Sequence, residues 1–398
     1  MILRWFAFLF FPVFCNNVMG QRVITGAENT GKYFPLLKGK SIAVFANATS
    51  VIGKTHLVDT LVNQGIRVVK VFAPEHGFRG KAEAGEHVNS YIDSSTNVEV
   101  VSLYGNKTKP CAADLKNIDV LVFDIQDVGV RFYTYISSLQ YFIEAAIENN
   151  KPIIVLDRPN PNGFYVDGPV LDPKFKSFVG MQSVPVVYGM TIGEYAKMLV
   201  GEKWLDSSVY KNRCSGFRLT VIPCGNYTHE SKYILPVKPS PNLPELQSIY
   251  LYPSTCLFEG TVLNEGRGTE KPFQIFGHPS LPDSLFSYIP VANEGAKNPK
   301  LKDKVCYGWN LAGSPRQVLN FADKKFQLKW LIQAYELYPD KENFFLESSF
   351  NRLAGNDVLI KQIQNHTSEA VIRKSWQKEL NRFKRIRKKY LLYKDFKI

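Results

Sequence analysis

The sequence has only six cysteines, and no two of them stand in a CxxC spacing. Zinc knuckles and dithiol redox sites need such spacings, so the sequence excludes both classes. It also lacks any long low-complexity tract, and 45% of its residues are hydrophobic while 21% are charged. A chain of 398 residues with this composition can bury a large core, which excludes a largely disordered protein.

Nucleotide and serine-hydrolase motifs are also missing. The loop after the first predicted strand reads Ala-Asn-Ala-Thr-Ser and has no GxGxxG pattern, so we expect no bound dinucleotide. Gly53-Lys54-Thr55 resembles the end of a phosphate-binding P-loop, but Ala48 stands where the first glycine of that loop belongs. No GxSxG elbow is present. We therefore expect no cofactor.

The only marked apolar run lies within the first twenty residues, where Arg4 precedes an aromatic-rich stretch. Val18 and Gly20 fit the small-residue rule for cleavage before Gln21, and the run is too short to span a membrane. We predict a signal peptide over residues 1–20, export to the periplasm or cell exterior, and no integral membrane span. Cys15 offers an alternative as a lipidated cysteine, although Phe14 is a poor residue to precede it.

Positive charge is in excess, with a formal net charge of +13. Much of it lies between residues 374 and 397, in a stretch with a helical pattern. An excess of this kind favours anionic partners, but we expect no nucleic acid for an exported protein. The simplest interpretation is a solvated helix face, and the alternative is attraction to an anionic cell wall or outer surface.

The first half of the chain alternates short β-branched runs with helical patterns, which is typical of a parallel sheet covered by helices. We predict the α/β fold class, with a Rossmann-like, doubly wound and mostly parallel sheet, and a second, smaller α+β domain at the C-terminus. The predicted strands are 41–45, 67–72, 98–103, 119–123 and 152–156, and two predicted helices are 56–64 and 135–149.

A proline-rich stretch over residues 236–244 interrupts this pattern. Consecutive prolines sustain neither a helix nor a central strand, so we place the domain boundary there, giving domains 21–235 and 236–398. Upstream of it, Thr191 and Glu194 have the spacing of a helix N-capping box.

Carboxylates gather in the loops that follow the second and fourth predicted strands, at the edge where an open α/β sheet binds ligands. Glycoside cleavage needs one carboxyl group that donates a proton and a second that acts as base, nucleophile or electrostatic stabiliser. Glu75 has the best setting, because Pro74 fixes its approach from the strand. The four candidates are Glu75, Glu86, Asp124 and Asp127.

Alternatives exist for the same residues. Glu75 could instead pair with Arg79 or Arg131. Arg131, Tyr133 and Tyr135 suit a sugar that bears a carboxylate, since tyrosine stacks on the ring and arginine binds the acid, but they also suit a helix start packed in the core. The nearby Glu-His pair and His87 match no standard metal spacing, so we expect no metal.

At these positions the sequence resembles the bacterial exo-acting β-N-acetylmuramidases. The resemblance is carried, in order along the chain, by Phe72–Gly80, Ala84–Glu86, Ser102–Gly105, Phe123–Tyr135, Leu156–Pro161, Asp167–Pro169, Ser177–Gly180, Gly189–Glu194, Ser240–Pro244, Cys256–Thr261, Glu265–Thr269, Pro272–Phe273 and Tyr390–Tyr393. One departure is Tyr188, where the resemblance leads us to expect histidine before Gly-Met-Thr.

The resemblance implies a Rossmann-like domain without a dinucleotide, a smaller C-terminal domain and a cleft between them. It implies hydrolytic release of a non-reducing terminal N-acetylmuramic acid from a β-1,4 link, with peptidoglycan-derived saccharides as substrates. Glu75 and Glu86 become the leading catalytic carboxylates. Candidate substrate-binding residues are His76, Arg79, Asp124, Asp127, Arg131, Tyr133, Tyr135, Asn160, Glu265 and Arg267.

Two other functions stay open: a metal-dependent hydrolase of a wall amide, and a non-catalytic peptidoglycan-binding protein. The sequence does not fix whether the reaction retains or inverts the anomeric configuration, because that outcome depends on the distance between the two carboxyl groups.

Overall fold

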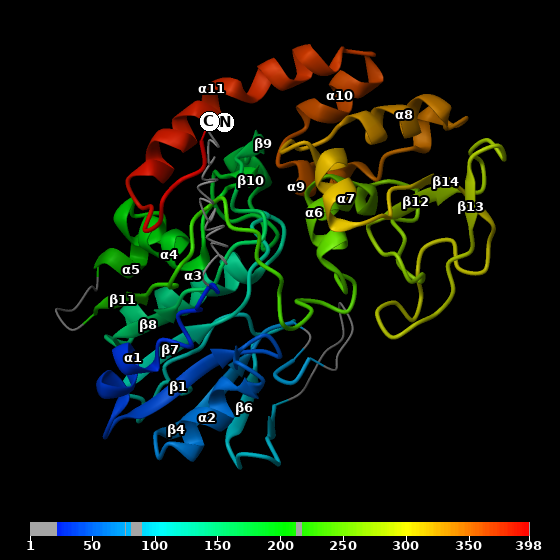
Figure 1. Ribbon diagram of the computed structural model, residues 1–398. Coiled ribbons are helices and arrows are strands. Elements are labelled where there is room, and N and C mark those ends of the chain that lie inside the picture. The colour runs from blue at the N-terminus through cyan, green and yellow to red at the C-terminus, as the bar shows by residue number, and fades with distance from the viewer. Residues whose placement is uncertain (1–21, 76, 81–89, 212–216, 398) are drawn as a thin grey trace, which may run out of the picture.

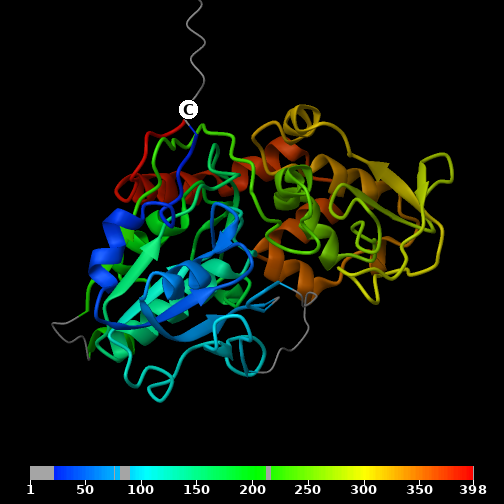
Figure 2. The same cartoon turned by 60° about the horizontal axis from the view of Figure 1, so that its bottom comes forward.

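The computed structural model describes residues 22–75, 77–80, 90–211 and 217–397. Figure 1 shows a sheet covered by helices, built mainly from the first half of the chain, beside a group of helices with a small sheet from the second half. The last long helix, drawn in red, crosses from the second group back to the first, and the turned view of Figure 2 agrees. The predicted signal peptide lies outside the described residues.

Seven strands form the central sheet, in the order β11-β8-β7-β1-β4-β6-β5. All pairs are parallel except β5 with β6 at the edge. From β1 the chain adds β4 and β6 on one side and β7, β8 and β11 on the other, which is the Rossmann-like order. The predicted fold class is thus confirmed. The bounds are β1 Ser41–Ala46, β4 Arg67–Ala73, β5 Tyr91–Ile92, β6 Glu99–Ser102, β7 Val120–Asp124, β8 Ile153–Leu156 and β11 Leu219–Ile222.

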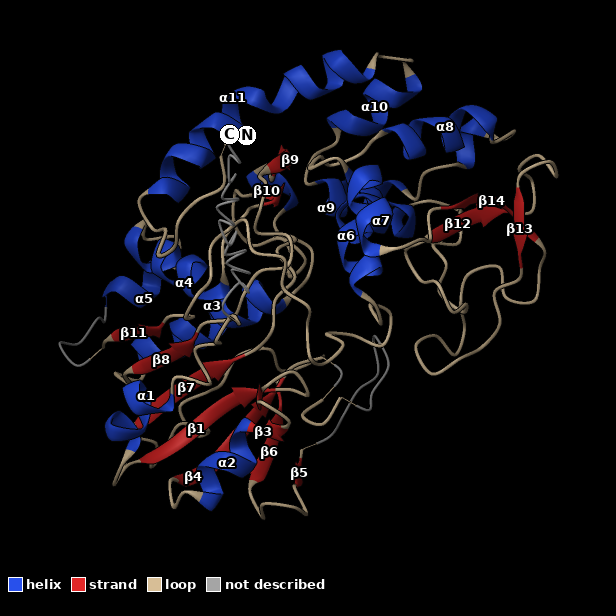
Figure 3. Cartoon of the chain, viewed as in Figure 1, coloured by secondary structure: helices blue, strands red, loops and turns tan. Residues whose placement is uncertain are grey.

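Both faces of this sheet are covered. In β1, Ile42 and Val44 join one apolar cluster, and Ala43 and Phe45 join the other. Helices α1 (Thr30–Leu37) and α2 (Leu57–Asn63) pack on the first face, whereas α3 (Tyr135–Glu148), α4 (Ile192–Gly201) and α5 (Ser207–Lys211) contribute to the second cluster. Burial on two sides explains why the strands read as continuous β-branched runs instead of alternating ones. Figure 3 shows the strands enclosed by these helices.

The elements predicted from the sequence are present. The five strands and the two helices each begin and end within one residue of the predicted ranges. The predicted capping box of α4 is also confirmed: Glu194 N donates to Thr191 Oγ1 at 3.3 Å, and Thr191 N donates to Glu194 Oε2 at 2.9 Å.

The second half of the chain holds a three-stranded antiparallel sheet in the order β12-β14-β13. Its strands are β12 Ile275–His278, β13 Phe286–Tyr288 and β14 Cys306–Asn310, and its helices are α6 Leu246–Thr255, α7 Pro315–Ala322, α8 Lys329–Leu337, α9 Glu347–Ala354 and α10 Val358–Gln364. Short elements complete the described chain: β2 Val51–Ile52, β3 Thr55–His56, β9 Asp167–Val170, β10 Pro185–Val187 and the 3-10 turns Pro173–Phe175, Cys256–Gly260 and Lys341–Asn343.

The last helix, α11 (Glu369–Lys388), returns to the first half and packs against β9. Arg387 is buried: its guanidinium donates to the carbonyl oxygen of Gly189 at 2.6 and 2.9 Å and pairs with Asp395 at 2.7 Å. Most other basic side chains of α11 point outward, among them Lys374, Lys378, Arg382, Arg385 and Lys388. The domain boundary that we place at residue 235 stays a prediction. The C-terminal segment with α11 belongs to the second half in sequence but packs on the N-terminal half.

Candidate active site

The candidate site lies where the parallel strands end. The chain turns to opposite sides of the sheet after β1 and β7, and this switch point is where doubly wound folds open a ligand crevice. The loops that meet there follow β1, β4, β7 and β8. Of the carboxylates that the sequence singled out, Glu75 follows β4, Asp124 ends β7 and Asp127 follows it, and the strand order brings these strand ends to one edge of the sheet.

Glu75 follows β4 at this edge, beside two tyrosines. The Tyr104 hydroxyl, which follows β6, is hydrogen-bonded to the Glu75 side chain; burial and the Glu75 charge raise the pKa of Tyr104 to about 12. Burial and the same charge also raise the pKa of Tyr135. Asn47 donates to the Tyr135 hydroxyl at 2.9 Å. Tyr104 and Asn47 were not among the predicted site residues, although Tyr104 lies in a segment that carries the family resemblance.

A line of aromatic side chains leads from Glu75 to the second half of the chain. Tyr135 meets Tyr133 edge-on with ring centroids 4.8 Å apart, and Tyr133 meets Tyr252 at 6.1 Å. Tyr252 in turn meets Phe273 at 4.8 Å, and the Arg267 guanidinium carbon lies 5.5 Å from the Phe273 ring centre. The candidates Tyr135 and Arg267 are therefore ends of one continuous packed line.

At the far end of this line is a charged hollow of about 370 Å³. Arg267 Nη2 contacts Glu259 Oε1 at 2.5 Å, and Lys300 Nζ contacts Glu265 Oε2 at 2.9 Å. Burial alone would lower the pKa of Arg267, but the carboxylates of Glu259 and Glu265 outweigh it and raise that pKa. The hollow is lined by Glu259, Glu265, Arg267, Gly295, Ala296, Lys297, Asn298, Pro299 and Lys300.

Asp127 is almost fully buried and interacts electrostatically with Tyr133 and Tyr135. Its Oδ2 accepts hydrogen bonds from the Tyr188 hydroxyl and from Gly129 N, the latter at 2.7 Å. Its Oδ1 has no hydrogen-bond partner within the described part of the chain. Burial raises the pKa of Asp127 to about 6, although the Tyr188 bond opposes this rise. The residue that departs from the expected histidine, Tyr188, is thus the direct partner of Asp127.

Two other candidate charges are held in ion pairs within the protein. Asp124 and Arg158 form a buried bidentate pair at 2.6 and 2.8 Å. Arg79 bridges Asp59 at 2.9 Å and Asp93 at 2.8 Å, so its guanidinium is directed at these two carboxylates. These contacts fix the loops after β4, β7 and β8.

Arg131 is fully buried, and its Nη atoms donate to four backbone carbonyls at 2.7 to 2.9 Å. Those carbonyls belong to Pro169, Val184, Leu353 and Ala354, so the side chain joins the two halves of the protein. These bonds favour the interpretation of Arg131 as a residue packed in the core, and they argue against a role in binding the acid of a substrate.

Asn160 also holds loops together by hydrogen bonds to their backbone. Its Nδ2 donates to the Met190 carbonyl at 2.8 Å, and its Oδ1 accepts from Asn162 N at 2.8 Å. Two further predicted residues, His76 and Glu86, lie outside the described residues.

The fold and this site together define a class: a doubly wound α/β protein whose sheet edge presents a carboxylate among tyrosines, with a charged hollow in the second half of the chain. The chain belongs to the exo-β-N-acetylmuramidase NamZ family. The N-terminal model of this family matches residues 42–247, and its C-terminal model matches residues 250–393.

Individual relatives agree with this assignment. The peptidoglycan β-N-acetylmuramidase NamZ of Bacillus subtilis is 41% identical, over 91% of this chain and 89% of its own. A crystal structure of a DUF1343 family protein from Bacteroides fragilis has a TM-score of 0.85 and 46% identity, covering 94% of this chain and 99% of that one. A second DUF1343 family protein from the same organism has a TM-score of 0.73 and 30% identity, with the same coverage.

The raised pKa of Asp127 makes stability depend on pH. In the folded protein Asp127 loses its proton at about pH 6, whereas in the unfolded chain the same carboxyl loses it near its ordinary pKa of 3.8. Between these two values only the folded state holds the proton, so the free energy of unfolding falls as pH rises. At about 1.4 kcal/mol per pKa unit, the expected loss is about 3 kcal/mol. Burial also raises the pKa of Asp157, so the native protein and Asp127→Asn share a further loss, and the Asp127 contribution is the difference between their profiles in urea unfolding at several pH values. Parallel pH profiles of the two proteins would contradict the prediction.

Arg131→Met should destabilise the protein strongly, because it removes four buried hydrogen bonds to backbone carbonyls. The carbonyls of Val184 and Ala354 keep a second donor, from Leu171 N and Asn356 Nδ2. We expect a loss of about 3 kcal/mol or more in the free energy of unfolding. The matched control is Arg382→Met, whose exposed guanidinium should contribute less than about 0.5 kcal/mol. Urea unfolding at neutral pH measures both, and equal effects would reject the structural role of Arg131.

Proposed function

We propose that this protein is an exo-acting glycoside hydrolase that releases N-acetylmuramic acid from the non-reducing ends of β-1,4-linked peptidoglycan fragments. The observation that carries the proposal is Glu75, which follows a central strand and is hydrogen-bonded to Tyr104 in a chain of the NamZ family. A carboxyl group at the switch point of an α/β sheet, beside aromatic rings, suits acid catalysis on a sugar.

In the proposed mechanism Glu75 protonates the glycosidic oxygen as the bond to the leaving sugar breaks. A second carboxylate then supports the attacking water or the oxocarbenium-like transition state, and Glu86 is our first choice for it. Asp124 is a weaker choice, because Arg158 binds both of its oxygens. Asp127 keeps one oxygen without a hydrogen-bond partner among described atoms, but it is almost fully buried.

We propose that the charged hollow of the second half binds the acidic part of the substrate. N-acetylmuramic acid bears a carboxylate that N-acetylglucosamine lacks, so a cationic wall distinguishes the two sugars. Three cations, Arg267, Lys297 and Lys300, line that wall together with Glu259 and Glu265. The aromatic line from Tyr135 to Phe273 supports this placement, because it connects the hollow to Glu75.

We also propose that the protein is exported and works in the periplasm or outside the cell. The support is the sequence of the first twenty residues, with lipid attachment at Cys15 as the alternative. No described helix is long and apolar enough to cross a membrane.

Glu75→Gln tests the catalytic role. We expect turnover of a chromogenic N-acetylmuraminide to fall by at least about 100-fold, because the amide cannot donate the proton. Glu148→Gln is the matched control, since Glu148 lies at the exposed end of α3 and forms an ion pair with Lys109. Both variants should unfold at the same temperature as the native protein. Near-native turnover by Glu75→Gln would refute the assignment.

The two rival functions make different predictions for the same assay. A metal-dependent amide hydrolase loses activity in chelator and regains it with zinc, and a non-catalytic binder releases no reducing sugar. Within the described ranges, no three His, Cys, Asp or Glu side chains gather as metal ligands. We expect sugar release from peptidoglycan fragments to be unchanged after treatment with chelator; a loss that zinc restores would favour the amide hydrolase.

A further inference from the structure

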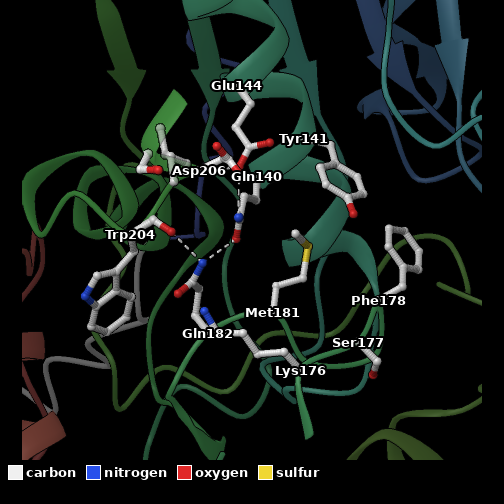
Figure 4. Close-up of a pocket in the computed structure, with 12 residues that line it drawn as sticks. Gln140, Tyr141, Glu144, Lys176, Ser177, Phe178, Met181, Gln182, Trp204 and Asp206 are labelled. Atoms are coloured by element: carbon white, nitrogen blue, oxygen red, sulfur yellow. Dashed lines mark hydrogen bonds between the residues drawn. The ribbon is translucent and has the colours of Figure 1, made fainter. Parts of the chain in front are cut away.

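A second hollow, of about 500 Å³, lies away from the candidate active site (Figure 4). It is enclosed by α3, by the segment 176–182 and by the start of α5. Aromatic, amide and carboxylate side chains are prominent in its lining. The lining residues are Gln140, Tyr141, Glu144, Lys176, Ser177, Phe178, Met181, Gln182, Trp204, Leu205, Asp206 and Ser207.

This hollow is separate from the catalytic edge, although both involve α3. At 3.6 residues per turn, Gln140 and Glu144 lie roughly 140° to 180° around the helix axis from Tyr135, whose hydroxyl lies in the site beside Asn47. One face of α3 therefore serves the site at the sheet edge, and the opposite face forms a wall of the hollow.

Aromatic rings stand on two sides of the hollow. Tyr141 and Phe178 form a stacked pair with centroids 6.0 Å apart and planes 20° from parallel. Trp204 lies on the opposite side, as Figure 4 shows. Flat rings of this kind bind the C–H faces of pyranose sugars, because those faces are apolar while the sugar's edge is polar.

The polar groups between these rings are held in fixed positions. Gln182 Nε2 donates to Gln140 Oε1 at 2.9 Å and to the Trp204 carbonyl at 2.6 Å. Gln140 Nε2 in turn donates to Glu144 at 2.9 Å. These bonds are drawn in Figure 4, and they orient two amide groups at the centre of the hollow before any ligand arrives.

One lining group has no partner: the Ser177 Oγ is buried and makes no hydrogen bond in the described part of the protein. A buried hydroxyl without a partner costs about 1 to 3 kcal/mol, and this oxygen is inaccessible to solvent, so it does not itself contact a ligand in the hollow. Glu144 is already paired with Lys109 at 3.3 Å, so the site does not need a cationic ligand to balance its charge.

We propose that this hollow binds one or two N-acetylhexosamine units of a peptidoglycan glycan strand, as a second, non-catalytic site. Its volume lies within the usual range of small-ligand pockets, about 300 to 1,000 Å³. Fixed amide groups between aromatic rings match an uncharged, hydroxyl-rich ligand. The choice of glycan rests on the proposed function, but the presence of the saccharide site does not.

The test separates the two sites by using a Glu75→Gln background and two probes: purified peptidoglycan sacculi in a sedimentation assay, and triacetylchitotriose in a calorimetric titration. Trp204→Ala and Tyr141→Ala should each weaken binding to sacculi by at least five-fold. With Glu75 restored, both variants should keep turnover of a chromogenic N-acetylmuraminide within two-fold. Phe321→Ala is the matched control, because its ring is exposed on α7 outside the hollow.

Native-like binding of both probes by Trp204→Ala and Tyr141→Ala would overturn the proposal. Should one alanine variant fail to fold, Trp204→Phe and Gln182→Glu replace it in the test. Trp204→Phe keeps an aromatic ring and should keep binding. Gln182→Glu removes the amide that donates to Gln140 and should lose binding. A protein that binds sacculi through Trp204 but never turns over the muraminide would reject the proposed function and leave this inference standing.

Discussion

The site depends on hydrogen bonds that join the loop after β1 to the loop after β7. Thr49 Oγ1 accepts from Gln126 N at 3.0 Å, and the Ser50 hydroxyl donates to the Asp124 carbonyl. Asn47, held in the same turn by its bonds to Thr49, reaches across to the Tyr135 hydroxyl. The crevice at the switch point is therefore bridged by side chains, and this bridge sets the position of the tyrosine beside Glu75.

This bridge explains why the loop has no glycines. A glycine-rich turn lets backbone N–H groups approach a phosphate, whereas the turn here uses Asn47, Thr49 and Ser50 to bind the neighbouring loop. The strand order is that of nucleotide-binding Rossmann-like sheets, but the loop at the switch point presents side chains instead of bare backbone. A sugar, which is recognised by side-chain hydrogen bonds and aromatic faces, suits such an edge better than a pyrophosphate does.

The sequence predicted the local elements well, because their signals are local. Periodicity and β-branched runs mark the strands of the sheet, and the spacing of Thr191 and Glu194 marks a cap. For the site, the sequence singled out the loops after β4 and β7, and the structure places Glu75 beside Tyr104 and Tyr135. The sequence did not single out Tyr104 or Asn47, since each acts through a contact with a residue distant in sequence.

Arginine roles were the hardest to predict, for the same reason. Arg131 stands next to two tyrosines in the sequence, which suggests a sugar-acid site, yet its four acceptors come from residues 169 to 354. A buried guanidinium whose Nη atoms donate to backbone carbonyls has no sequence signature. Because Arg131 is bonded to backbone carbonyls, our proposal gives the binding of the substrate acid to the cations that line the charged hollow, among them Arg267.

The wall of that hollow has a fixed relation to Glu75, because the two halves of the chain are joined at several buried points. Arg131 bonds to the end of α9, and Arg387 of α11 bonds to Gly189. Tyr393 beyond α11 donates to Asp157, whose pKa burial raises to about 7. With the second half anchored at these points, the aromatic contacts from Tyr135 to Phe273 keep their separations, and packing fixes the position of the wall relative to the sheet edge.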